Sequence, residues 1–68
     1  MNVFEFLKSV IGNKVEITQI SGLVISGTLR SFRFEPDMYC AVIVENDKCW
    51  YVVNWNQVLR VTIPKTET

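Results

Sequence analysis

The chain has 68 residues, 49% of them hydrophobic, and its 7 basic side chains are balanced by 7 acidic ones. This length fits a single domain, residues 1–68, whose core alone provides only modest stability. Zero net charge argues against a nonspecific nucleic-acid binder, because such proteins are usually basic. Without histidine and with only 2 cysteines, the chain lacks ligands for a tetrahedral metal site, so we expect no metal and no cofactor.

Residues 2–11 are predicted to form a helix, because their apolar side chains recur at the spacing of one helical face. Asn2 is a favourable N-cap, and Glu5 three residues later completes a capping-box pattern. Gly12 suits the left-handed conformation that often ends a helix. A helix this short is unstable alone in water, so we expect it to pack on the rest of the domain.

From Lys14 the hydrophobic period changes to two, which indicates β-strands. We predict strands at residues 14–20, 23–34, 38–45, 48–54 and 58–63, followed by a frayed tail at 64–68. Gly27 lies within the second strand, where glycine often marks the sharp bend of a small barrel. Pro36 ends the pairing of the second and third strands, and Asn46 with Asp47 predicts a two-residue hairpin turn.

The hairpin turn also bears on the two cysteines. With Asn46 and Asp47 at its tip, Val44 faces Cys49 and Cys40 faces Val53. The two cysteines are then too far apart along the ladder for a disulfide. We predict free thiols that act as small core residues.

The third and fourth strands are apolar on both faces, so both faces need cover. One face closes the barrel, and the remaining apolar surface predicts an interface with other copies of the chain. Oligomerisation is the expected source of additional stability, since neither a disulfide nor a metal provides it. No apolar run is long enough to span a membrane, and Glu5 and Lys8 interrupt the N-terminal segment, so we expect no membrane partner and a cytoplasmic location.

The order of one helix and five strands, with a bend in the second strand, resembles the Sm fold. This is the strongly bent, five-stranded antiparallel, SH3-like barrel of Sm, Sm-like (LSm) and Hfq proteins. The family's first motif, Gly-x-x-Val-x-Val followed by a turn glycine and Gly-x-Leu with an aromatic residue, is matched by residues 12–17, Gly22 and residues 27–32. The asparagine that reads a base in the family is replaced by Asp37 in an ungapped register, or by Ala41 if the loop is longer.

The family's second motif is a hydrophobic residue, a basic residue, glycine, two variable residues and a branched apolar residue. Residues 53–58 have its length and its ends, but Asn54 and Trp55 replace the basic residue and the glycine. The resemblance implies a homo-oligomeric ring in which the fourth strand of one subunit joins the fifth strand of the next. It also implies a single-stranded RNA site on two loops, with candidate residues Arg33, Phe34, Asp37, Tyr39, Asn54, Trp55 and Asn56.

Each candidate also has a structural interpretation. Trp55 either stacks on a base or packs at the end of the barrel. Asn54 and Asn56 either read base edges or satisfy backbone groups in the turn. Arg33 is suited to a phosphate contact, whereas Asp37 in the same loop opposes one.

An enzyme is not expected, because the chain has no histidine, no glycine-rich phosphate-binding loop and no cysteine beside a base. Three hypotheses remain open. The first is a ring-forming Sm-like protein that binds single-stranded RNA. The second is an oligomeric structural or scaffold protein that has lost the RNA site, and the third is an isolated SH3-like barrel that binds a peptide.

Overall fold

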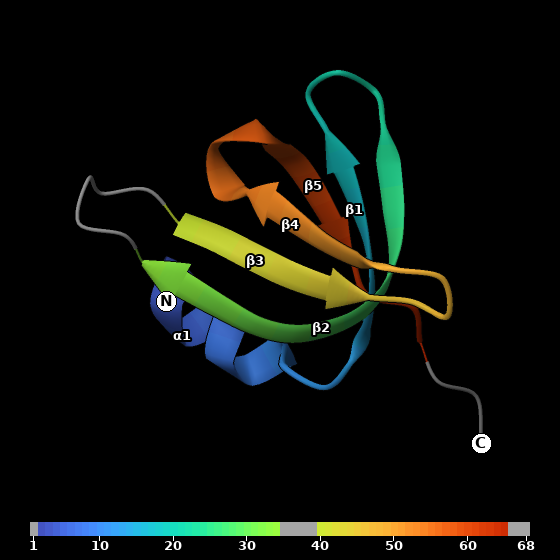
Figure 1. Ribbon diagram of the computed structural model, residues 1–68. Coiled ribbons are helices and arrows are strands. Elements are labelled where there is room, and N and C mark those ends of the chain that lie inside the picture. The colour runs from blue at the N-terminus through green and yellow to red at the C-terminus, as the bar shows by residue number, and fades with distance from the viewer. Residues whose placement is uncertain (1, 35–39, 66–68) are drawn as a thin grey trace.

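The computed structural model describes residues 2–34 and 40–65. Helix α1 (Val3–Val10) is followed by β1 (Lys14–Gln19), β2 (Val24–Phe34), β3 (Cys40–Glu45), β4 (Trp50–Asn54), the 3₁₀ turn η1 (Trp55–Gln57) and β5 (Val58–Thr62). The strands form one antiparallel 5-stranded sheet in the order β4-β3-β2-β1-β5 (Figure 1). A mostly β fold with one N-terminal helix and five strands is therefore confirmed.

The predicted closed barrel needs a correction. β4 and β5 lie at opposite ends of the strand order and do not pair with each other in the described part of the chain. The sheet curves strongly (Figure 1), yet its two edges stay open. Both edge strands therefore keep one side on which the backbone donors and acceptors have no neighbouring strand.

Helix α1 begins at the predicted cap and is attached to the middle of β2. The Oδ1 atom of Asn2 accepts a hydrogen bond of 2.8 Å from the Glu5 backbone N–H. Gly12 has a φ of +90°, which lets the chain turn after the helix. The Gly12 N–H then donates to the Leu29 carbonyl at 2.8 Å, and the Leu29 N–H donates to the Asn13 carbonyl at 3.0 Å. These bonds hold the helix against the sheet.

The core combines buried side chains of the helix with those of the curved sheet. Its fully buried side chains come from the helix and three strands, and they are Leu7, Ile17, Leu29, Val42 and Val44. No polar or charged residue is buried among the described residues. Stability therefore comes from apolar burial.

Strand β2 changes partner along its length, and Gly27 lies where the change occurs. Its first half pairs with β1 up to Thr28, and from Thr28 onward it pairs with β3. A Cβ atom at Gly27 would lie 2.5 Å from the Glu45 carbonyl oxygen. Only glycine allows β3 to approach β2 so closely at the bend.

The predicted hairpin turn between β3 and β4 is displaced by one residue. The Asn46 N–H donates to the Cys49 carbonyl at 3.1 Å, so Asp47 and Lys48 form the tip instead of Asn46 and Asp47. Glu45 pairs with Trp50 and Val44 pairs with Tyr51, so four residues, 46–49, form the connection. The cause is the side chain of Asn46, whose Oδ1 accepts from the backbone N–H groups of Lys48 at 2.9 Å and Cys49 at 3.0 Å. Such side-chain bonds stabilise a turn at this position.

The new register changes the interpretation of one cysteine. Both thiols are free, as predicted. Cys40 is buried, and burial raises the pKa of its thiol. Cys49, however, lies exposed in the turn, so its predicted role as a core residue is wrong.

Candidate functional site

The strand register brings the two predicted RNA-binding loops to one end of the sheet. Ala41 on β3 pairs with Arg33 on β2 and with Asn54 on β4. Arg33, Phe34 and residues 54–56 therefore lie at the same end, although some 20 residues separate them along the chain. The other two candidates, Asp37 and Tyr39, lie outside the described residues.

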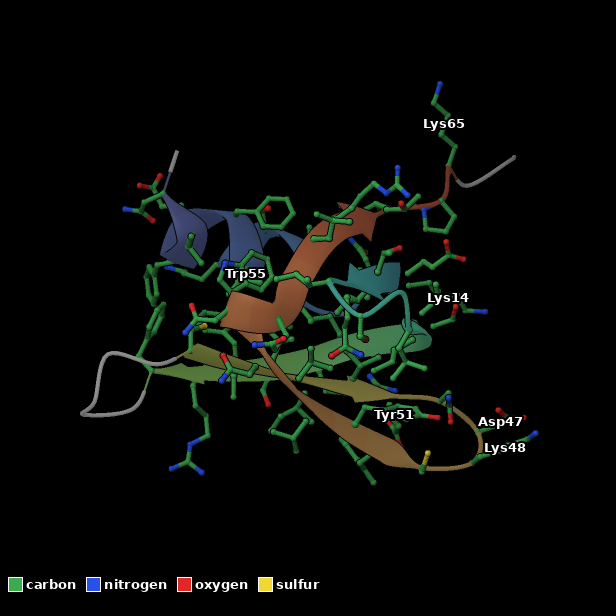
Figure 2. The ribbon with its side chains drawn as sticks, turned by 90° about the horizontal axis from the view of Figure 1, so that it is seen from above. Lys14, Asp47, Lys48, Tyr51, Trp55 and Lys65 are labelled. Carbon is green, nitrogen blue, oxygen red and sulfur yellow. The ribbon has the colours of Figure 1, made fainter. Side chains whose placement is uncertain are left out.

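Trp55 is the first residue of η1 and is half-buried beside the helix. Its ring centroid lies 6.5 Å from that of Phe6, and the two planes are tilted by 47°. Asn2, Val3, Phe6 and Trp55 line an apolar notch of about 320 Å³ (Figure 2 shows Trp55 next to α1). Trp55 thus packs on the helix and still lines an accessible hollow.

The two asparagines beside Trp55 differ in side-chain hydrogen bonding and in exposure. The Oδ1 atom of Asn54 accepts a hydrogen bond of 2.9 Å from the Asn56 backbone N–H and so caps η1. Asn54 is half-buried, whereas Asn56 is exposed. Asn54 therefore satisfies a backbone group of the turn, and Asn56 presents its side chain to solvent.

Phe34 belongs to an aromatic cluster that joins the end of β2 to the helix. Its ring centroid lies 5.9 Å from that of Phe32 and 6.0 Å from that of Phe4, and the centroids of Phe4 and Phe32 are 5.6 Å apart. The Nζ atom of Lys8 lies 5.1 Å from the centre of the Phe4 ring, a cation–π contact. Phe4 and Phe34 remain exposed over about half of their surface, 46% and 52%.

Sequence reasoning missed Phe4 and Lys8 as part of this surface. Phe4 belongs to the apolar side chains of residues 2–11, and this was the sequence feature that could have pointed to it. Its contact with Phe34, however, depends on how the helix packs against the sheet. The cluster of Phe4, Phe32 and Phe34 with Lys8 can hold a stacked base and a neighbouring phosphate. Arg33 is exposed at the same end of β2, but it lies on the opposite face of the strand from Phe34 because successive strand residues alternate in direction.

The edge strands carry a second notable set of side chains. On β4, Trp50 is 60% exposed and Val52 is 67% exposed. On β5, Leu59 is 67% exposed. Large apolar residues on unpaired strand edges form a surface that favours association with another strand.

Other classes of site have little support in the described residues. Across residues 2–34 and 40–65, no three Cys, Asp or Glu side chains gather where they could bind a metal ion. In the same ranges, no helix is both long and apolar enough to span a bilayer.

Comparison with protein-family models, with curated protein sequences and with solved structures finds no match to the chain. The geometry of its own residues is therefore the basis for a functional assignment.

Proposed function

We propose that this chain is a Sm-like protein that assembles into a homo-oligomeric ring through β4 of one copy and β5 of the next. The observation that carries the proposal is the pair of open sheet edges, with Trp50 and Val52 exposed on one and Leu59 on the other. In the same proposal, single-stranded RNA binds at the end of the sheet formed by Arg33, Phe34 and residues 54–56.

Assembly is favoured by both backbone and side-chain groups of the edge strands. Pairing of the two edges supplies ladder hydrogen bonds to groups that have no partner strand in the single chain. Burial of a large apolar side chain contributes about 1.5–3 kcal/mol. A contact between two different edges is head-to-tail, so it closes into a ring when the rotation between neighbours allows.

RNA binding would use the aromatic faces and basic groups at one end of the sheet. Trp55 and Phe34 offer rings for base stacking, Lys8 lies over Phe4 in the same cluster as Phe34, and Arg33 is an exposed positive charge at the same end of the sheet. Because few basic side chains lie at this end, we expect the site to contact a short stretch of RNA and its affinity to fall moderately as the salt concentration rises. A ring would repeat this contact in every subunit, which raises the affinity for a strand that spans several subunits.

Assembly is tested by the mass of the native protein in solution. We expect light scattering coupled to size-exclusion chromatography to give a fixed multiple of the 7.9 kDa chain mass. The multiple should persist on dilution into the micromolar range. A stable monomer at high concentration would refute the ring.

RNA binding is tested with short U-rich and A-rich homopolymers at low salt. We expect Trp55→Ala to weaken binding about tenfold or more, because a stacked base contributes about 1–3 kcal/mol. Trp55→Phe keeps an aromatic ring and should retain most of the affinity. Thermal melts followed by circular dichroism establish that both variants are folded, and equal affinity of Trp55→Ala and wild type would argue against stacking at this position.

A second candidate function is an oligomeric scaffold without an RNA site. It is favoured by the local roles of the two residues that replace the family's basic–glycine pair: Asn54 caps η1, and Trp55 packs on Phe6. A ring mass without binding to any homopolymer at low salt would select this alternative.

A further inference from the structure

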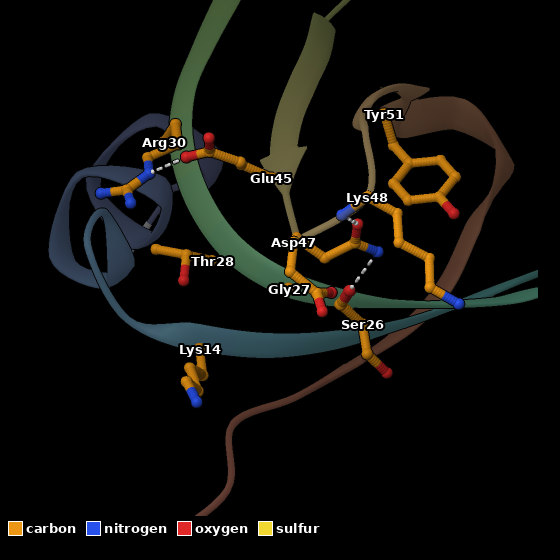
Figure 3. A pocket seen from close by; sticks show the side chains of 10 residues that line it. Lys14, Ser26, Gly27, Thr28, Arg30, Glu45, Asp47, Lys48 and Tyr51 are labelled. Atoms are coloured by element: carbon orange, nitrogen blue, oxygen red, sulfur yellow. Dashed lines mark hydrogen bonds and ion pairs between the residues drawn. The ribbon is translucent and has the colours of Figure 1, made fainter.

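The chain has a second concave surface, at the opposite end of the β3–β4 hairpin from Trp55. It is a groove of about 810 Å³ between the first half of β2 and the hairpin turn (Figure 3). This volume lies in the range typical of small-molecule sites. We propose that the groove binds a nucleotide, with its phosphate at Lys48 and its base against the ring of Tyr51.

The groove is held in shape by the hairpin turn and by the bend of β2. The Nδ2 atom of Asn46 donates to the Ser26 carbonyl at 3.3 Å, which ties the turn to β2 (Figure 3). The close approach of the Glu45 carbonyl to Gly27 holds β3 against β2 at the bend. The walls are therefore formed by paired strands and a bonded turn, so the site is preorganised.

The charges that line the groove leave a positive excess. Arg30 and Glu45 form an ion pair with 2.8 Å between Nε and Oε1, which removes one charge of each sign. Lys14 and Lys48 then remain against the single carboxylate of Asp47. Within residues 2–34 and 40–65, no ion pair engages either lysine. The Lys48 ammonium group, which Figure 3 shows beside Tyr51, favours a ligand with a compact negative charge, such as a phosphate.

Neutral groups of the groove suit the rest of a nucleotide. The hydroxyl groups of Ser26 and Thr28 line the same wall and can donate hydrogen bonds to phosphate or ribose oxygens. Tyr51 is half-buried and offers its ring for stacking. The neighbouring Cys49 side chain raises the pKa of the Tyr51 phenol. The Tyr51 ring next to the Lys48 ammonium group favours a nucleotide over free phosphate.

The same chemistry is presented by a free mononucleotide and by one nucleotide of an RNA strand. Tyr51 of the groove lies on β4, the strand of the proposed subunit contact, but no groove residue belongs to the RNA site near Trp55. Loss of binding at one site should therefore leave the other unchanged.

The test is a titration of the full chain with AMP and UMP, followed by amide NMR for location and calorimetry for affinity. We expect shifts at residues 26–28 and 46–51 and none at residues 54–56. Adenosine and uridine, which lack the phosphate, and inorganic phosphate, which lacks the nucleoside, should bind more weakly than AMP and UMP. Absence of groove shifts at millimolar nucleotide would overturn the proposal.

Variants identify the contacts. Lys48→Gln should weaken nucleotide binding about tenfold, which is the effect of one charge-assisted hydrogen bond. Lys65→Gln is the matched control, because Lys65 is exposed beyond β5 and far from the groove in Figure 2. Tyr51→Phe should keep most of the affinity and Tyr51→Leu should lose it. Equal affinities of Lys48→Gln and Lys65→Gln would contradict the assignment.

An oligonucleotide distinguishes the two sources of the ligand. If a short RNA shifts the groove amides and Lys48→Gln weakens its binding, the nucleotide belongs to an RNA strand. If only AMP or UMP shifts them, the ligand is a free nucleotide. If neither does so, the groove is not a nucleotide site.

Discussion

Val52→Lys is expected to give a folded monomer under conditions in which the wild-type chain assembles. Val52 is 67% exposed on the open edge of β4, so the replacement should change the free energy of unfolding by no more than about 0.5 kcal/mol. In the proposed ring, however, the ammonium group would have to be desolvated between two strands. Charged residues on strand edges block such pairing, and several subunit contacts would fail together.

The experiment compares masses by light scattering over a range of concentrations. Val24→Lys is the matched control, because Val24 is also an exposed valine but pairs with Thr18 of β1, away from the β4 and β5 edges of the proposed contact. We expect this control to keep the wild-type mass. An unchanged mass for Val52→Lys would show that β4 does not form the subunit contact.

A mixture of two variants tests which edges meet. Leu59→Glu places a carboxylate on the β5 edge and should also be monomeric. Each variant keeps one intact edge, so a head-to-tail contact predicts that mixed samples form a heterodimer through the β5 edge of Val52→Lys and the β4 edge of Leu59→Glu. A contact between two β4 edges predicts instead that Leu59→Glu associates on its own through its intact β4 edge and that added Val52→Lys does not join it.

The helix and strands were predictable because their signals are local. The apolar spacing of residues 2–11, the Asn2 cap and the change of period at Lys14 each report on neighbouring residues, and each agrees with the structure. The bend at Gly27 was also predictable, since a glycine inside a strand usually marks a bend or a close approach of another backbone. These features do not depend on how distant segments pack.

The position of the β3–β4 turn was not predictable from its residue types. Asn and Asp are favourable at more than one position of a tight turn. The choice depends on the Asn46 side chain, which bonds two backbone amides of the turn and the Ser26 carbonyl on β2. That last contact requires β2 to be in place, so local sequence alone does not determine the register or the exposure of Cys49.

The candidate site also has one feature that the sequence predicted and others that depend on tertiary packing. That the loops around Arg33 and Trp55 meet at one end of the sheet followed from the resemblance in strand order, and the strand register agrees with it. The Phe4–Phe34 contact, the notch beside Trp55 and the groove around Lys48 each join segments far apart in the chain. Their members look like ordinary helix, strand and turn residues until the tertiary structure brings them together.

Gly27→Ala is expected to destabilise the fold by about 1–3 kcal/mol, the usual cost of forcing an extra group into a packed site. Two effects oppose each other. Replacing glycine by alanine within a strand normally stabilises by about 0.5–1 kcal/mol, because the unfolded chain loses freedom. Here the added Cβ would lie 2.5 Å from the Glu45 carbonyl oxygen and 2.9 Å from a methyl group of Val44. The first of these neighbours is backbone and cannot rotate away, so the clash outweighs the entropic gain.

Urea denaturation checks this prediction through the transition midpoint, with Ser26→Ala, at the neighbouring exposed position, as the control. A domain of this size has a total stability of only about 3–10 kcal/mol, so the expected loss is a large share and should lower the midpoint clearly. A midpoint equal to that of the wild type would mean that β3 moves away from β2 at little cost. Because Gly27 and Glu45 also line the groove, the strain at the bend should weaken nucleotide binding even where the variant remains folded.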